Sequence, residues 1–210
     1  MSTPTDEQPL GRRERRKLET RAKLVAAARS LIAGQGVDAV RINEITDEAD
    51  VGFGSFYNHF ESKEAIVAAV VEAVASELGD AIDAATSDLD DAAEVMAVAH
   101  RTIIDRAAAE PTLGWLLVRL ELSHDVVSTA LGPYALRDLQ RGIAAGRFHV
   151  DDQAATLIAL GGALLGAVRA VLLGRVGDDP AITHAALALQ LLGLPAGEAQ
   201  EVARRPLPRG

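Results

Sequence analysis

The amino-acid sequence predicts an all-α fold of about nine helices, and three observations support this prediction. Hydrophobic residues make up 49% of the chain and are mostly Ala, Leu and Val, whereas aromatic residues make up only 3%. This balance favours packed helices over a β-sandwich. Apolar residues recur at spacings of three and four, which is the period of an α-helix. Clusters of Gly, Pro, Ser and Asp separate these segments, as expected for turns and helix caps.

The first predicted helix spans residues 13–33. Its apolar stripe includes Ala28 and Ile32, and Gly34 follows as an end signal. Residues 1–11 contain two prolines among polar side chains, so we expect a disordered tail there.

The segment after the first helix contains two short predicted helices separated by a tight turn. Ile42, Ile45 and Ala49 fall on one face of the first of these helices. The turn follows at residues 50–52, where Asp and Gly tolerate the left-handed backbone region. The second helix is predicted at 53–60. A helix, a tight turn and a short helix form the DNA-reading helix-turn-helix, whose second helix enters the major groove.

This segment also carries a longer motif, in which a small residue and Ser precede two aromatic residues, His, Phe and Lys. The matching residues are Ile42, Ile45, Ala49, Val51, Gly54, Ser55, Phe56, Tyr57, His59, Phe60 and Lys63. The motif resembles that of the TetR family of bacterial transcription regulators, over about residues 12–84. The chain departs from the family pattern with Asp50 in place of Gly and Thr46 in place of Ala. It also has Arg41 where Ser or Thr commonly caps the helix, and the missing cap is expected to cost about 1 kcal/mol of local stability.

The resemblance implies a sequence-specific, homodimeric DNA-binding regulator with a small-molecule site in its C-terminal domain. We interpret the chain as a ligand-responsive repressor that binds a palindromic operator. A helix-turn-helix domain is predicted at residues 12–61, followed by a fourth helix that begins the ligand-binding and dimerisation domain at 62–194. A C-terminal tail is predicted at 195–210.

Two sets of side chains are predicted to contact double-stranded DNA. Asn can pair with adenine, Gly permits close backbone approach, and Tyr, His, Lys and Arg donate to phosphate oxygens. The predicted base-reading residues are Asn43, Phe53, Gly54, Ser55 and Asn58, and the predicted phosphate contacts are Arg41, Tyr57, His59, Lys63, Arg16 and Lys17. The family resemblance implies the backbone contacts of Tyr57, His59 and Lys63. The alternatives are a packing role for Tyr57 and a helix-capping role for His59.

The net charge of −9 is compatible with DNA binding because the charge is unevenly distributed. Residues 1–63 hold ten basic and ten acidic side chains, whereas residues 64–210 hold eleven basic and twenty acidic ones. The segment 12–29 contains eight basic and two acidic residues. Screening over about 10 Å hides the distant negative charge, so this segment can still bind phosphate. The alternative is a solvated basic start of a helix.

The apolar patterns in the rest of the sequence predict a helical body with a subunit interface. Further helices are expected at 63–85, at 91–109, from 111, at 124–145 with an interruption near Gly132-Pro133, at 153–173 and at 180–192. The uncharged run 154–168 is shorter than the roughly 20 residues that cross a bilayer, so we expect protein to bury it. This run and the ninth predicted helix together indicate a dimer interface built as a four-helix bundle. The alternative is that the two helices pack as a pair in the core of a monomer. The interface candidates are Gly161, Gly162, Leu165, Gly166, Ile182 and Leu189.

A small-molecule pocket would need an apolar lining with a few polar groups. The candidates are Met96, His100, Trp115, Arg119, Tyr134 and Arg169. Met96 and His100 share a helix face. The alternatives are core packing for the Trp, Met and His, and an ion pair of Arg119 with Glu121 or Asp125. The effector is expected to be largely apolar.

Other classes of protein are disfavoured by the sequence. The chain has no Cys and its five His have no metal-ligand spacing, so neither a metal site nor a cofactor is expected. It contains no nucleophile elbow, phosphate loop or dinucleotide fingerprint, which argues against an enzyme. The polar N-terminus predicts a cytoplasmic protein that does not enter the membrane. The remaining alternative is a constitutive DNA-organising dimer without a ligand, which would have a filled C-terminal core.

Overall fold

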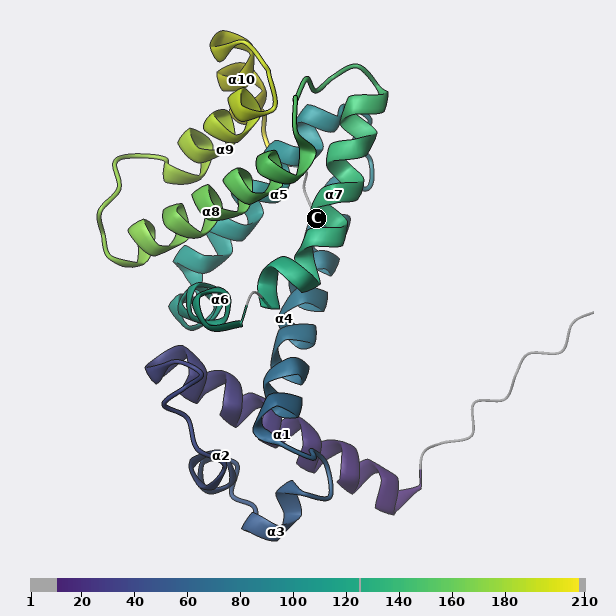
Figure 1. Ribbon diagram of the computed structural model, residues 1–210, viewed down its shortest axis with the longest axis vertical. Helices are drawn as coiled ribbons and strands as arrows, with labels where there is room; N and C mark the ends of the chain where they lie inside the picture. The colour runs from purple at the N-terminus through teal and green to yellow at the C-terminus, as the bar shows by residue number, and fades with distance from the viewer. Residues whose placement is uncertain (1–10, 125, 208–210) are drawn as a thin grey trace, which may run out of the picture.

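The computed structural model describes the backbone of residues 11–124 and 126–207, and the side chains of these residues except 121–131. Within this part of the chain every regular element is a helix, which confirms the all-α fold. The predicted disordered segment lies almost wholly outside the described residues. Figure 1 shows three helices at one end of the molecule, which we call the reading head, and a long helix leading from them into a larger helical body.

The reading head consists of α1 (Arg12–Gln35), α2 (Ile42–Glu48) and α3 (Phe53–Phe56). Its helices bury Leu24, Ile45 and Phe56 against the start of the next helix. α3 is shorter than predicted, because regular helix ends at Phe56 and turns continue to residue 59. The amides of His59 and Phe60 still bond to the carbonyl of Phe56, so the predicted segment stays compact without being one helix.

The long helix α4 (Lys63–Thr86) connects the two parts. Its N-terminus is capped as predicted, since the Ser62 hydroxyl oxygen accepts a hydrogen bond from the Ala65 amide at 3.3 Å. One continuous apolar cluster extends from Leu24 of α1 through Val70 of α4 to Val168 in the body. The head is therefore packed onto the body and not merely tethered to it.

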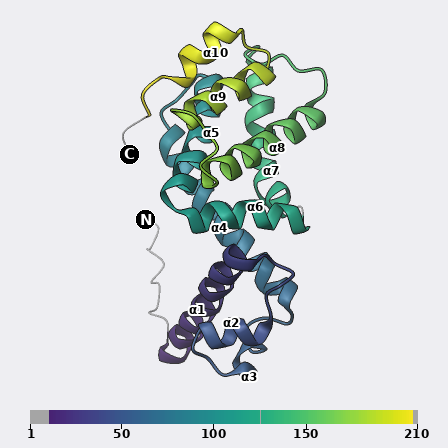
Figure 2. The same ribbon diagram turned by 90° about the vertical axis from the view of Figure 1, so that its left-hand side faces the viewer.

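The body surrounds α5, which packs against α4, α6, α7, α8, α9 and α10 (Figure 2). The bounds are α5 (Ala92–Ala109), α6 (Pro111–His124), α7 (Val126–Ala144), α8 (Gln153–Leu172), α9 (Pro180–Leu191) and α10 (Ala196–Ala203). A second apolar cluster joins α5, α7, α9 and α10, and it includes Phe148 and Leu189.

Two sequence predictions about the body were wrong. The helix α7 runs through Pro133 without interruption. Proline removes one hydrogen bond, and the packing of α7 against α4 and α5 holds the flanking turns in place. The predicted C-terminal tail contains α10, so the described residues form ten helices, not nine. In α10 the side chains of Ala199 and Val202 are buried against α5 and α9.

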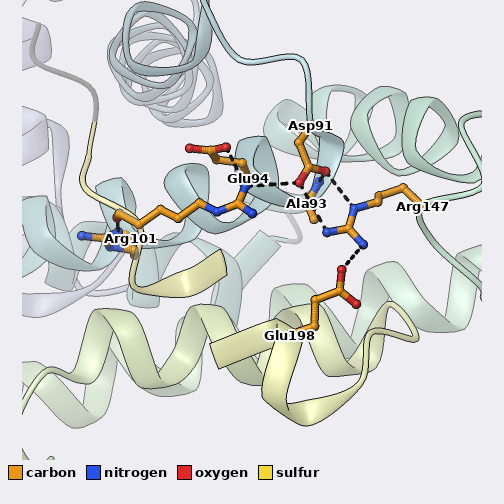
Figure 3. Close-up of polar contacts among 7 residues, drawn as sticks. Asp91, Ala93, Glu94, Arg101, Arg147 and Glu198 are labelled. Carbon is orange, nitrogen blue, oxygen red and sulfur yellow. Dashed lines mark hydrogen bonds and ion pairs between the residues drawn. The ribbon is translucent and has the colours of Figure 1, made fainter. Parts of the chain in front are cut away.

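A polar network fastens α10 to the body (Figure 3). Asp91 caps α5 by accepting from the Ala93 amide at 3.0 Å, and it also accepts from Nε of Arg147 at 2.8 Å. The same guanidinium donates to Glu198 of α10 at 2.6 Å. Arg101 of α5 donates to the backbone carbonyl of Ala203 at 3.1 Å. Burial alone would raise the pKa of Asp91, but the Arg147 hydrogen bonds and charge outweigh burial and lower it.

Candidate DNA-reading head and effector cavity

The tip of the reading head exposes two aromatic side chains, one on α3 and one directly after it. Phe53 and Tyr57 are each 54% exposed, and their rings meet edge to face with centroids 5.8 Å apart. The fully buried Phe56 anchors the helix from beneath. Gly54 of α3 and Asn58 of the following turn are also exposed, so α3 and this turn together offer aromatic and amide groups to a groove.

The turn before α3 shows how the chain accommodates its departures from the family pattern. Asp50 has φ of 52°, the left-handed conformation that the sequence predicted for this turn. The hydroxyl of the buried Thr46 donates to the Asn43 carbonyl at 2.9 Å, so it is not left unpaired. The Arg41 amide donates to the Glu44 carboxylate at 2.8 Å. Glu44 thus satisfies the amide of the N-cap residue, whereas the Arg41 side chain provides no cap, as the sequence predicted.

The side chains predicted to contact phosphate differ in their exposure and in the hydrogen bonds that they already make. Arg16, Lys17 and Arg41 are exposed, whereas the ammonium group of Lys63 donates to the carbonyl of Asp38 at 3.2 Å. His59 is partly buried and its Nδ1 has no hydrogen-bond partner. Burial lowers the pKa of His59, and the charges of Lys17 and Arg21 lower it further, so all three favour the neutral imidazole.

Every predicted DNA-contacting residue lies on the head or, for Lys63, at the first residue of α4, and none is buried. Ser55, His59 and Lys63 are partly exposed. The exposed ones are Arg16, Lys17, Arg41, Asn43, Phe53, Gly54, Tyr57 and Asn58. Their roles on DNA stay a prediction.

An ion-pair network joins the head to the body. Arg29 of α1 donates to Glu77 of α4 at 2.7 Å and to Glu110, at the junction of α5 and α6, at 3.3 Å. Arg106 of α5 also donates to Glu77. Burial alone would raise the pKa of Glu77, but the hydrogen bonds and charges of both arginines lower it. A shift of α4 against α5 would therefore also change the position of α1, because Glu77 pairs with arginines of both α1 and α5.

The body contains a cavity of about 610 Å³ between α4, α5, α7 and α8. Three of the six predicted pocket residues line it, namely Met96, His100 and Tyr134. The other three do not. Trp115 packs on the first apolar cluster with the Arg119 guanidinium 5.4 Å from its ring, and Arg169 is exposed on α8. The alternative pairing of Arg119 with Glu121 or Asp125 involves side chains outside the described residues.

Sequence reasoning missed three charged residues of the cavity lining, Asp83, Arg137 and Asp138. Nε of Arg137 donates to Asp138 at 3.1 Å, and its guanidinium lies 4.0 Å from Asp83. The guanidinium also lies 5.6 Å from the Tyr134 ring centroid. The spacing of Tyr134 and Arg137, one helical turn apart, was a signal that could have found the cluster.

His100 is the buried polar residue of the cavity, with 6% of its surface exposed. Its Nδ1 lies 3.0 Å from the carbonyl oxygen of Met96, whereas its Nε2 has no partner among the side chains that the structure describes. Burial lowers the pKa of His100 to about 4. The ring of His184 on α9 lies nearly parallel to it, with centroids 6.0 Å apart.

The outer face of α8 and α9 is apolar and exposed. Gly162 and Gly166 are exposed, together with Leu187 at 53%, whereas the exposed Ile158 lines the cavity. By length and composition α8 is apolar enough to cross a membrane, which is weak evidence, and only 11% of its apolar window is buried within this chain. From the sequence we expected α8 to be buried by protein. Within this single chain most of its apolar window stays exposed.

The other interface candidates do not lie on this open face. Leu189 is wholly buried inside the subunit, so its assignment to the interface was wrong. Ile182 is partly buried against the second apolar cluster. Gly161 and Leu165 line the cavity.

Comparison with known proteins identifies the family. The family model described as "Bacterial regulatory proteins, tetR family" matches residues 24–70. The model described as "Tetracyclin repressor-like, C-terminal domain" matches residues 91–205, which is more than half of the chain. The chain belongs to the TetR family.

Solved structures of this family agree with the assignment. RolR in complex with resorcinol is 36% identical, with a TM-score of 0.74 over 93% of this chain and 98% of that one. A TetR family transcription regulator from Shewanella sp. PV-4 is 20% identical, with a TM-score of 0.73 over 81% and 96% of the two chains. FadR from Bacillus subtilis, in complex with stearoyl-CoA, is 19% identical with a TM-score of 0.67 over 81% and 96%. At these lower identities the likeness shows the fold alone.

Among curated proteins no match to the sequence is found. TetR-family regulators bind DNA and small molecules and usually form dimers. The chain is therefore a transcription regulator of this family.

Proposed function

We propose that this TetR-family regulator is a homodimeric repressor that binds a roughly palindromic operator and releases it when a small, largely apolar effector fills the cavity. One observation carries the proposal. The single helix α4 begins at the reading head and provides Gly79, Ile82 and Asp83 to the cavity wall. A molecule in the cavity thus touches the element that holds the head.

The reading of DNA is assigned to α3 and its flanks. Phe53, Gly54 and Asn58 enter the major groove and contact base edges, supported by Asn43 and Ser55. Tyr57, His59 and Lys63, with the basic start of α1, hold the phosphate backbone and set the register. Two heads related by a two-fold axis require a palindrome with half-sites about one helical turn or somewhat more apart.

The dimer is assigned to the open face of α8 and α9. Leu187 and Leu191 of α9 are exposed there. Gly162 and Gly166 would let a second helix approach closely, because they carry no side chain. Burying these apolar groups in a four-helix bundle provides the free energy of association.

Release of the operator is assigned to a shift between two conformations. The effector favours the one in which α4 is displaced, and the Arg29–Glu77–Arg106 network carries the displacement to α1. The heads then no longer match the half-site spacing.

The effector class is inferred from the cavity and from one relative. The lining is mostly aliphatic, with its charged groups gathered around Arg137. RolR, at 36% identity, was crystallised with resorcinol, a small phenol. A neutral aromatic or aliphatic molecule fits this lining. The constitutive DNA-organising dimer is not favoured, because it would have a filled core where this chain has a cavity.

The test is selection of bound duplexes from a random DNA pool at two salt concentrations, with and without resorcinol. We expect an enriched palindrome that survives the higher salt and is released by the phenol. Sequence-indifferent binding that disappears at higher salt would indicate counterion release alone and overturn the proposal.

A further inference from the structure

The imidazole of His100 has its tautomer fixed by its own helix. Nδ1 lies 3.0 Å from the carbonyl oxygen of Met96, one helical turn earlier. A carbonyl oxygen only accepts hydrogen bonds, so Nδ1 must carry the proton. Nε2 is then a lone-pair acceptor. It is buried and has no partner within the described part of the chain.

The charged groups that line the cavity do not satisfy this acceptor. Arg137 is engaged with Asp138 and Asp83 and lies over the ring of Tyr134. His184 is near, but its ring lies nearly parallel to that of His100 and no hydrogen bond joins them. A buried acceptor without a partner is unfavourable. His100 lines the cavity, so an occupant whose hydroxyl displaces the side chains covering Nε2 gains a hydrogen bond there.

The environment also selects the kind of donor. Burial keeps His100 neutral, with a pKa lowered to about 4. A carboxylate would place its own lone pairs against Nε2 and would lose hydration among the aliphatic side chains of Met96 and Leu160. An ammonium ion would lose its hydration in the same way. A neutral hydroxyl meets the acceptor without either cost.

We propose that His100 is the specificity-determining residue of the effector cavity, and that its Nε2 accepts a hydrogen bond from a hydroxyl group of a neutral, largely apolar effector. The effector class is thus phenols or apolar alcohols and excludes carboxylates. This inference rests on the proposed function of the cavity as an effector site.

The test is calorimetric titration of the full-length protein with three probes that share one ring system, 2-naphthol, 2-methoxynaphthalene and 2-naphthoate, and with resorcinol as a smaller hydroxyl compound. We expect 2-naphthol to bind roughly tenfold more tightly than its methyl ether, the size of effect that one buried hydrogen bond gives. The carboxylate should bind more weakly than both.

Two variants and one control assign this preference to His100. His100→Leu should bind 2-naphthol and its ether equally, because it has no acceptor. His100→Gln should retain the preference through its amide oxygen, which also covers the case in which the Leu variant folds poorly. His184→Leu is the matched control and should behave as the unaltered protein does.

Three outcomes would overturn the proposal: equal binding of naphthol and ether by the unaltered protein, a preference that persists in His100→Leu, or no binding of either hydroxyl compound. Operator affinity of each variant without any probe is measured in parallel. A variant that binds the operator but has lost the hydroxyl preference supports the role of His100. Failure to select any operator would instead refute the proposed function.

Discussion

Lys63 and Tyr57 illustrate how single residues divide between holding DNA and reading it. The Lys63 ammonium has three donors and uses one on the carbonyl of Asp38, so two remain for a phosphate. We predict that Lys63→Ala weakens binding to every duplex by about the same factor and lowers the salt dependence by about one phosphate contact. Binding titrations on the selected operator and on scrambled duplexes at several salt concentrations measure this effect.

Tyr57→Phe serves as the companion variant because it removes only the hydroxyl of an exposed ring. It too should weaken all duplexes alike. A change in the preferred base pair with either variant would place that residue among the base readers instead.

His100 also makes stability depend on pH. Its folded pKa of about 4 lies below its ordinary value of 6.5, so the unfolded chain binds more protons between these values. The contribution of His100 to the free energy of unfolding is therefore complete above pH 6.5 and is lost as the pH falls towards 4. This contribution is at most about 3 kcal/mol. We predict that the urea midpoint falls less steeply from pH 7 to pH 5 in His100→Gln than in the unaltered protein.

The comparison is made at one fixed protein concentration, since dimers gain stability with concentration. Glu77 and Asp91 have lowered pKa values, so they titrate below the range from pH 7 to pH 5. The pKa values of His59 and His184 are lowered as well, but both residues are present in both proteins and do not affect the comparison. Identical slopes in the two proteins would show that His100 is not a buried neutral base.

The sequence predicted the burial of a residue well where apolar residues follow one face of an element, and poorly where they surround it. The motif around Phe56 separates an inward ring from the exposed Phe53 and Tyr57. In α9 the apolar residues surround the whole helix, so periodicity could not distinguish the buried Leu189 from the exposed Leu187. The free acceptor of His100 depends on a contact with Met96 that no residue pattern specifies.

At the scale of elements, α10 was missed because little of its stability is local. Its eight residues contain one Gly and follow Pro195, and its buried residues are small. A helix this short is marginal by itself, so packing and the Arg147 network must hold it. Sequence patterns identified the longer helices, including α4 and α5, because their apolar stripes repeat over several turns.

We predict that Arg147→Ala lowers the free energy of unfolding by about 1–2 kcal/mol, because it leaves Asp91 and Glu198 without their partly buried partner. Hydrogen exchange should increase most in α10. The exposed Arg204 gives a matched control, since Arg204→Ala removes the same charge near the same helix. Equal effects of the two substitutions would show that net charge, and not the network, stabilises α10.

At the scale of the whole molecule, the sequence predicted the order of the parts but not how firmly they are joined. A helix leaving the head was expected from Ser62 and the stripe that follows it. The continuous apolar cluster from α1 to α8, and the bridge from Arg29 to Glu77, arise from residues far apart in the sequence. Because of these contacts the head, α4 and the cavity wall are expected to move together. The proposed effector-controlled repressor requires such coupled movement.

The second subunit is the remaining part of this architecture, and Gly162 tests for it. A Cβ atom added at Gly162 would meet no described residue within 4 Å, so Gly162→Asp leaves the monomer fold undisturbed. In a four-helix bundle the same carboxylate would be desolvated against the partner's apolar face, at a cost of several kcal/mol. We predict that Gly162→Asp sediments as a folded monomer with weakened operator binding. Gly34→Asp, on the open surface of α1, is the control and should remain dimeric. A dimeric Gly162→Asp protein would mean that the exposed face of α8 is covered by something other than a second copy of the chain.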